Sequence, residues 1–164
     1  GAGWRGPAGG RPSPAVWGVA PPRALAVQLC GERKVAVSTI GARGLTIDGG
    51  RACEPQLEAL RKGIDVVVGT PGRLLDLAQQ GHLVLGKVSI LVLDEADEML
   101  DLGFLPDIEK LMKMVPDKRQ TMLFSATMPG PIVALARTFL VQPIQIRAEH
   151  GAEDTSTDHV DQFA

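Results

Sequence analysis

The sequence is short of the features that mark several classes of protein. Only two of its 164 residues are cysteines, Cys30 and Cys53, too few for a disulfide framework or a cysteine-based metal site. No apolar run approaches the roughly 18 residues that a membrane-spanning helix needs. The first residues also lack the hydrophobic region of a signal peptide. These absences favour a soluble protein of the reducing cytoplasm.

The sequence also lacks an excess of basic charge. Its Lys and Arg residues number 17 and its Asp and Glu residues 19, which gives a formal net charge of −2 and a pI near 5.9. Any binding of nucleic acid would therefore depend on a few placed arginines and backbone amides, not on bulk electrostatics. With 45% hydrophobic residues, the chain has enough apolar material for one globular domain.

Glycine and proline are concentrated at the N-terminal end, where residues 1–22 hold six glycines and five prolines. A segment of this composition is typical of chains that cannot bury enough surface to offset their conformational entropy. We therefore expect residues 1–19 to be disordered and residues 20–148 to form a single domain. Residues 149–164 are polar and are expected to be an interdomain linker.

Beyond that segment, short runs rich in β-branched residues alternate with stretches of helical spacing. The expected strands are Val35–Thr39, Ile64–Gly69, Ser89–Leu93, Thr121–Phe124 and Ile144–Arg147. The expected helices are Ala24–Gln28, Pro55–Lys62, Thr70–Gln79, Ile108–Val115 and Pro131–Leu140. Strands that alternate with helices of this length predict βαβ units and a parallel sheet in the α/β class.

An acidic motif follows one of these strands directly. Residues 90–93 are apolar on both faces, and they lead into Asp94-Glu95-Ala96-Asp97. In open α/β sheets, ligands bind in the crevice beyond the carboxyl ends of the strands. An aspartate and a glutamate there suit an NTPase site, where one holds hydrated magnesium and the other positions water. The alternative is the acidic first turn of a helix, which the helix dipole favours.

A second motif, Thr70-Pro71-Gly72-Arg73, stands where the preceding strand is expected to end. Thr70 is suited to cap a helix and Pro71 to occupy its first position. Gly72 lets another backbone approach closely, and the free amides of such a helix end attract an anion such as a phosphate. The alternative is a capped helix with a surface arginine, which accounts for Thr and Pro but not for the glycine.

A third motif, Ser125-Ala126-Thr127, follows the next expected strand. Its two hydroxyls can bond a carboxylate at the end of a neighbouring strand, and Asp97 is the natural candidate. In isolation, a Ser/Thr loop of this kind is more often only a loop.

Taken together and in this order, the three motifs resemble those of the DEAD-box RNA helicases. The resemblance extends from about Pro21 to Arg147 and covers the first of that family's two RecA-like domains. Within the family, the sequence is most similar in type to bacterial members. Pro21–Gln28 is similar to the family's Pro-Thr-Arg-Glu-Leu-Ala-x-Gln segment, and Gly49-Gly50 matches its Gly-Gly element. The resemblance implies a RecA-like, P-loop NTPase fold: a three-layer parallel sheet with helices on both faces, incomplete here at the N-terminus.

The resemblance also implies roles for the motif residues. Asp94 would hold hydrated Mg²⁺ on the phosphates of ATP, and Glu95 would activate the attacking water. Asp97 would connect to Ser125 and Thr127, coupling nucleotide state to the arrangement of the two domains. RNA would be held by its sugars and phosphates, without sequence specificity. The residues implied in this contact are Arg23, Gly49, Gly50, Thr70, Pro71, Gly72 and Arg73.

One departure limits what the resemblance implies for activity. Family members carry a glycine-rich phosphate loop ending in Gly-Lys-Thr, and no Gly-Lys-Ser or Gly-Lys-Thr occurs in this sequence. Without that loop and its lysine, little would hold the β- and γ-phosphates. We therefore expect a fragment of an ATP-dependent RNA helicase, inactive alone and without the second RecA-like domain. The alternative is a degenerate, non-catalytic module that binds RNA or docks proteins.

Overall fold

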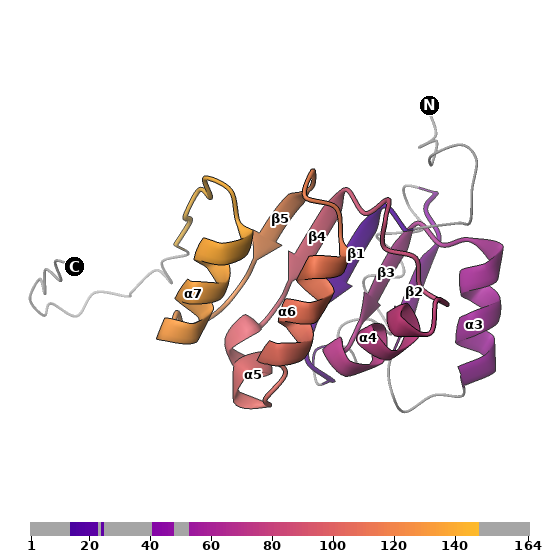
Figure 1. Ribbon diagram of the computed structural model, residues 1–164, viewed down its shortest axis with the longest axis horizontal. Coiled ribbons are helices and arrows are strands. Elements are labelled where there is room, and N and C mark those ends of the chain that lie inside the picture. Colours follow the sequence, from indigo (N-terminus) through magenta and orange to yellow (C-terminus); the bar gives the residue numbers. More distant parts are fainter. Residues whose placement is uncertain (1–13, 23, 25–40, 48–52, 148–164) are drawn as a thin grey trace, which may run out of the picture.

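The computed structural model describes residues 14–22, 24, 41–47 and 53–147 (Figure 1). Five parallel strands form one sheet in the order β2-β3-β1-β4-β5. The strands are β1 (Val16–Val19), β2 (Gly44–Ile47), β3 (Val66–Gly69), β4 (Ile90–Leu93) and β5 (Gln120–Leu123). The expected α/β class and parallel sheet are confirmed.

The helices connect these strands and cover the sheet. They are α3 (Cys53–Lys62), α4 (Pro71–Gln79), α5 (Ala96–Asp101), α6 (Leu105–Met114) and α7 (Gly130–Phe139). In Figure 1, α4, α5, α6 and α7 stand in front of the sheet, and α3 lies beside its β2 end. Helix α4 packs against α6, and α5 packs against α7. Ile108, Leu111 and Met112 of α6 are buried, as their helical spacing predicts.

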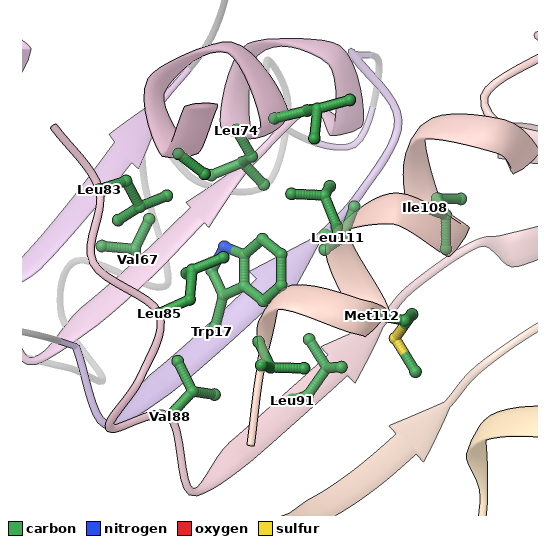
Figure 2. Close-up of a cluster of buried hydrophobic side chains, with 14 of the residues drawn as sticks. Trp17, Val67, Leu74, Leu83, Leu85, Val88, Leu91, Ile108, Leu111 and Met112 are labelled. Carbon is green, nitrogen blue, oxygen red and sulfur yellow. The ribbon is translucent and has the colours of Figure 1, made fainter. Parts of the chain in front are cut away.

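Strand β1 occupies the middle of the sheet, between β3 and β4. Trp17 in this strand is fully buried. Figure 2 shows its ring among apolar side chains that include Val67, Leu91 and Leu111. The expectation that residues 1–19 are disordered is therefore wrong for residues 14–19, while residues 1–13 lie outside the described chain. The apolar side chains around Gly18 are buried between two strands, and that burial outweighs the Gly/Pro composition of the segment.

Most of the other expected elements are confirmed, with ends displaced by at most three residues. Strand β2 and helix α5 were not expected. The expected strand Val35–Thr39 and most of the expected helix Ala24–Gln28 lie outside the described residues. The expected strand Ile144–Arg147 is wrong, because this segment is exposed and unpaired with any described strand. A strand needs a partner for its backbone groups, and local sequence does not supply one.

Gly69 sets how closely helix α4 approaches the sheet. A Cβ atom at this position would lie 2.6 Å from the Ile47 carbonyl oxygen and 2.8 Å from Cγ of Leu74. Real side chains do not approach so closely, and the Ile47 carbonyl belongs to the backbone of a paired strand. Glycine at the end of β3 therefore allows α4 to begin directly at the carboxyl edge of the sheet.

Gly69→Ala should destabilise the fold by about 1–3 kcal/mol, because the added methyl group forces α4 and β2 apart. Gly86→Ala is the matched control, since no described atom lies within 4 Å of a Cβ there, and it should change stability by less than about 0.5 kcal/mol. Urea unfolding followed by circular dichroism measures both values. Equal effects of the two substitutions would contradict the close packing at Gly69.

Candidate functional site

The parallel register brings the carboxyl ends of the strands to one level. Val19 pairs with both Gly69 and Leu93, and Leu93 pairs with Leu123. Each of these residues is the last of its strand. The segments that follow β3, β4 and β5 therefore start side by side along one edge of the sheet. These segments are the three motifs singled out in the sequence.

Strand β1 separates the motif after β3 from the motif after β4. Neighbouring strands lie about 4.8 Å apart, so the ends of β3 and β4 are about 10 Å from each other across β1. Backbone hydrogen bonds tie the three ends together: the Ala20 N–H donates to the Gly69 carbonyl (3.1 Å), and the Asp94 N–H donates to the Val19 carbonyl (2.9 Å). The edge therefore carries two separate groups of polar residues, one after β3 and one after β4 and β5, and hydrogen bonds between the strand ends hold both groups in place.

Asp94 and Glu95 form a sharp turn between β4 and α5, and both are half-buried. Glu95 has φ 52° and ψ 51°, in the left-handed region, which costs a residue other than glycine about 1–2 kcal/mol. The N–H of Ala96 donates to the Phe124 carbonyl at 3.1 Å, which fixes the turn to the end of β5. Non-glycine residues held in this region are concentrated at functional sites.

The alternative interpretation, the acidic first turn of a helix, holds for the second half of the motif. Asp97 and Glu98 occupy the first turn of α5, where the partial positive charge of the helix end favours carboxylates. Asp94 and Glu95 precede the helix, and the turn sets them at the carboxyl edge of the sheet.

Asp97 is hydrogen-bonded to the loop that follows β5, as the sequence motifs suggested. Its Oδ2 atom accepts hydrogen bonds from the backbone N–H and the hydroxyl of Thr127, each at 2.8 Å. The Ser125 hydroxyl accepts from the Asp97 backbone N–H (3.1 Å) and donates to the Thr127 carbonyl (2.7 Å). Ser125, in the loop after β5, thus satisfies a free amide at the start of α5 and so performs a capping role.

These hydrogen bonds also change the acidity of Asp97. Partial burial by itself would raise the pKa of its carboxyl group. The donors from Thr127 and the bond with Ser125 stabilise the carboxylate more strongly, so the pKa of Asp97 lies below its ordinary value of 3.8. Asp97 is therefore charged at neutral pH, and the loop after β5 is bonded to that charge.

The motif after β3 begins helix α4 with Pro71 in its first position, as expected. Thr70 is buried at the N-cap position, but its side chain makes no capping hydrogen bond, so that expectation is wrong. Its position is determined by backbone bonds instead: its N–H donates to the Ile47 carbonyl (3.2 Å), and its carbonyl accepts from the Leu74 N–H (3.0 Å).

Gly72 and Arg73 complete the first turn of α4. A Cβ atom at Gly72 would lie 3.7 Å from Oδ2 of Asp107 and 4.0 Å from the ring of Phe104, an ordinary contact. No close approach among the described residues requires a glycine there. Arg73 is not a fully exposed surface arginine: its guanidinium pairs with Asp76 at 2.7 Å, and its side chain is 19% exposed.

Some predicted contributors cannot be placed and others were not predicted. Arg23, Gly49 and Gly50 lie outside the described residues. The carbonyls of Val19 and Phe124 fix the acidic turn, and backbone groups leave no pattern in a sequence. Strand β1 did leave a pattern in the sequence, because its short apolar run ends at the two prolines Pro21 and Pro22.

The described residues contain no group of three or more His, Cys, Asp or Glu side chains able to hold a metal ion directly. Mg²⁺ is commonly held by one or two carboxylates and several waters, an arrangement that Asp94 fits. No helix in the described part of the chain has the length and hydrophobicity to cross a membrane.

Comparison with known proteins identifies similar sequences. A family model described as DEAD/DEAH box helicase matches residues 10–135. That match begins before Pro21 and includes β1. The DEAD-box ATP-dependent RNA helicase CshA of Streptococcus pneumoniae is 44% identical over 145 residues, covering 88% of this chain and 27% of that protein. The ATP-dependent RNA helicase DeaD of Escherichia coli is 45% identical over 138 residues, covering 84% of this chain and 22% of that protein.

Solved structures show the same fold. A DEAD box protein from the hyperthermophile Methanococcus jannaschii superposes with a TM-score of 0.71 at 36% identity, over 79% of this chain and 36% of that one. A hypothetical ATP-dependent RNA helicase from Sulfolobus tokodaii superposes with a TM-score of 0.72 at 32% identity, over 79% of this chain and 39% of that one. The chain spans about a quarter of the length of the curated relatives cited above.

Thr127→Val removes the hydroxyl that donates to Asp97 and keeps the backbone N–H. The pKa of Asp97 should rise toward 3.8, as measured by carboxyl NMR titration. Because the native pKa is lowered, this carboxylate stabilises the wild type fully above about pH 3.8, and the effect is lost as pH falls through the native pKa. The stability lost in Thr127→Val should therefore be largest near neutral pH and decrease in acid.

Thr138→Val is the matched control for this prediction. It removes a threonine hydroxyl that donates to the Ala134 carbonyl within α7, away from Asp97. The pKa of Asp97 should be unchanged in this variant. If Thr127→Val also leaves that pKa unchanged, the hydroxyl does not stabilise the carboxylate in solution.

Proposed function

Because the chain belongs to the DEAD/DEAH box helicase family, we propose that it is the part of an ATP-dependent RNA helicase that contacts the nucleotide and one RNA strand. One observation carries this proposal: the parallel register sets Thr70–Arg73, Asp94–Asp97 and Ser125–Thr127 along a single edge of the sheet. Relatives named as ATP-dependent RNA helicases support the same conclusion. Since RNA and ATP occur together in the cytoplasm, we expect the chain to act there.

The acidic turn is the proposed nucleotide side of the site. Asp94, half-buried at the end of β4, would hold Mg²⁺ through water, and Glu95 would orient and deprotonate the water that attacks ATP. Bound Mg²⁺ would neutralise part of the negative charge on the ATP phosphates. The turn at Glu95 is held by backbone bonds to two neighbouring strands, which keeps these carboxylates in a fixed place.

The start of α4 is the proposed RNA side. Its first-turn amides and helix dipole attract phosphate, and Gly72 adds no side chain that would shield these amides. Thr70, Pro71 and Arg73 would complete this contact, together with Arg23, Gly49 and Gly50. Contacts to sugar and phosphate give binding without sequence specificity.

The hydrogen bonds among Asp97, Ser125 and Thr127 are the proposed coupling element. They join the helix that follows the acidic turn to the loop that leads into α7. A change at Glu95 would therefore be transmitted to this loop through bonded groups. A second RecA-like domain is the partner to which we propose that this movement is passed.

Arg73→Ala should weaken binding of a fluorescently labelled single-stranded RNA about tenfold at low salt, the value of one charged hydrogen bond of about 1.5 kcal/mol. Arg137→Ala removes the same charge from the exposed last turn of α7. That helix runs back from the carboxyl edge, so this control should bind RNA as the wild type does. Fluorescence anisotropy measures all three affinities.

Asp76→Asn distinguishes an RNA contact from a structural role of the ion pair. It neutralises the carboxylate that Arg73 contacts and keeps the guanidinium, so RNA affinity should stay level or increase. If Asp76→Asn weakens binding as much as Arg73→Ala does, the pair acts only by holding α4 in place. RNA affinity that is equal in Arg73→Ala and wild type would show the RNA face to be misplaced.

ATP binding by the chain alone should be weaker than micromolar, because the sequence contains no Gly-Lys-Ser or Gly-Lys-Thr to hold the β- and γ-phosphates. Isothermal titration with Mg²⁺ and ATP measures this affinity. Micromolar binding that Asp94→Asn abolishes would show that these residues hold a triphosphate without such a loop.

A further inference from the structure

The start of helix α6 lies against the start of helix α4, which is the proposed RNA side. Helix α4 packs against α6, and the side chains nearest to Gly72 come from the beginning of α6. A Cβ atom at Gly72 would lie 3.7 Å from Oδ2 of Asp107 and 4.0 Å from the ring of Phe104. Outside α4 itself, the atom closest to that position is therefore a carboxylate oxygen.

The charge of Asp107 is only weakly compensated by its own helix. Lys110 approaches Oδ1 of Asp107 to 3.9 Å, and the two side chains are 59% and 33% exposed. An exposed ion pair at this distance contributes little, because water screens it. Lys110 is nearest to Oδ1, whereas Oδ2 is the oxygen that lies near Gly72. The negative charge of Asp107 is therefore felt at the start of α4.

The other charges on this face do not provide an excess of positive charge. The Arg73 guanidinium pairs with Asp76 at 2.7 Å, and Asp76 also accepts a hydrogen bond from the Gln80 amide. Together with Lys110 and Asp107, these charged side chains sum to zero. Attraction of a phosphate to this face therefore depends on the first-turn amides of α4, and Asp107 stands beside them.

The position of Asp107 has a structural explanation within α6 as well. It lies in the first turn of that helix, where the helix dipole favours a carboxylate. This explanation accounts for an acidic residue at the start of α6, and it predicts no effect on a ligand of α4. The contact with Gly72 predicts such an effect, because a side chain at position 72 would touch Oδ2 and glycine leaves that oxygen uncovered.

We propose that Asp107 limits the affinity of the α4 start for RNA, so that this side of the site binds a phosphate weakly and releases it readily. The inference rests on the proposed function, because it takes an RNA phosphate as the ligand. A phosphate bound to the first-turn amides would stand within a few ångströms of Oδ2, and like charges at such a distance repel each other at a half-buried site. Retention of an RNA strand then requires further contacts elsewhere.

Asp107→Asn removes this charge and keeps the shape of the side chain. It should lower the dissociation constant of the full chain for a labelled oligouridylate about fivefold at low salt, and the gain should decrease as salt screens the charges. Glu109→Gln is the matched control, since it removes the same charge from an exposed position on another side of α6. It should change the affinity less than about twofold. Fluorescence anisotropy at several salt concentrations measures all three affinities.

The same substitution in the Arg73→Ala variant tests how the charge acts. Asp107 is proposed to repel the phosphate directly, so Asp107→Asn should give the same relative gain when the guanidinium is absent. A gain that disappears in Arg73→Ala would show that Asp107 acts through the arginine, and would overturn the proposal. So would an RNA affinity of Asp107→Asn that is no higher than that of the wild type, or a gain that Glu109→Gln reproduces.

These outcomes are distinct from a failure of the proposed function. If the wild type binds oligouridylate and Asp107→Asn binds it equally well, RNA binding stands and only the role of Asp107 is wrong. If neither protein binds it at low salt, the RNA side itself is misplaced, and the inference is overturned with it.

Discussion

The parallel ladder around β1 is the constraint on which the rest of the structure depends. This strand pairs on both sides in level register, so the strands that flank it end at the same height. The polar segments that follow these strands therefore lie along one edge of the sheet. Gly69 then lets helix α4 start at that edge, and backbone bonds from Val19 and Phe124 fix the acidic turn. Site geometry is therefore determined by the backbone before any side chain contributes.

Side-chain patterns predicted the parts of the fold that local sequence encodes. The apolar runs before Thr70 and Asp94 and the helical spacing of Ile108, Leu111 and Met112 each correspond to an observed element. The pairing of Asp97 with the Ser125–Thr127 loop was also predictable, because carboxylates and hydroxyls at neighbouring strand ends complement each other. In each of these cases the residue type itself carries the interaction.

Predictions failed where a distant partner or the backbone decides the outcome. Overall Gly/Pro content suggested disorder at residues 14–19, yet burial between two strands holds them in the sheet. The strand pattern of Ile144–Arg147 is equally local, and no described strand pairs with it. Thr70 has a capping residue type but its backbone is fixed by Ile47, and the left-handed turn at Glu95 has no counterpart in residue preference.

The central position of β1 has a consequence for how the molecule assembles. Val16 pairs with Val66 and with Ile90, so the middle of the sheet closes only after long stretches of chain have been brought together. Contacts of this separation slow folding, because loop-closure entropy is lost before the contacts compensate for it. The core around Trp17 cannot close as a local hairpin or helix pair, since its walls come from β3, α4, residues 83–88, β4 and α6. Folding of this domain should therefore be slow and cooperative, and the carboxyl edge of the sheet is organised only once β1 has paired with β3 and β4.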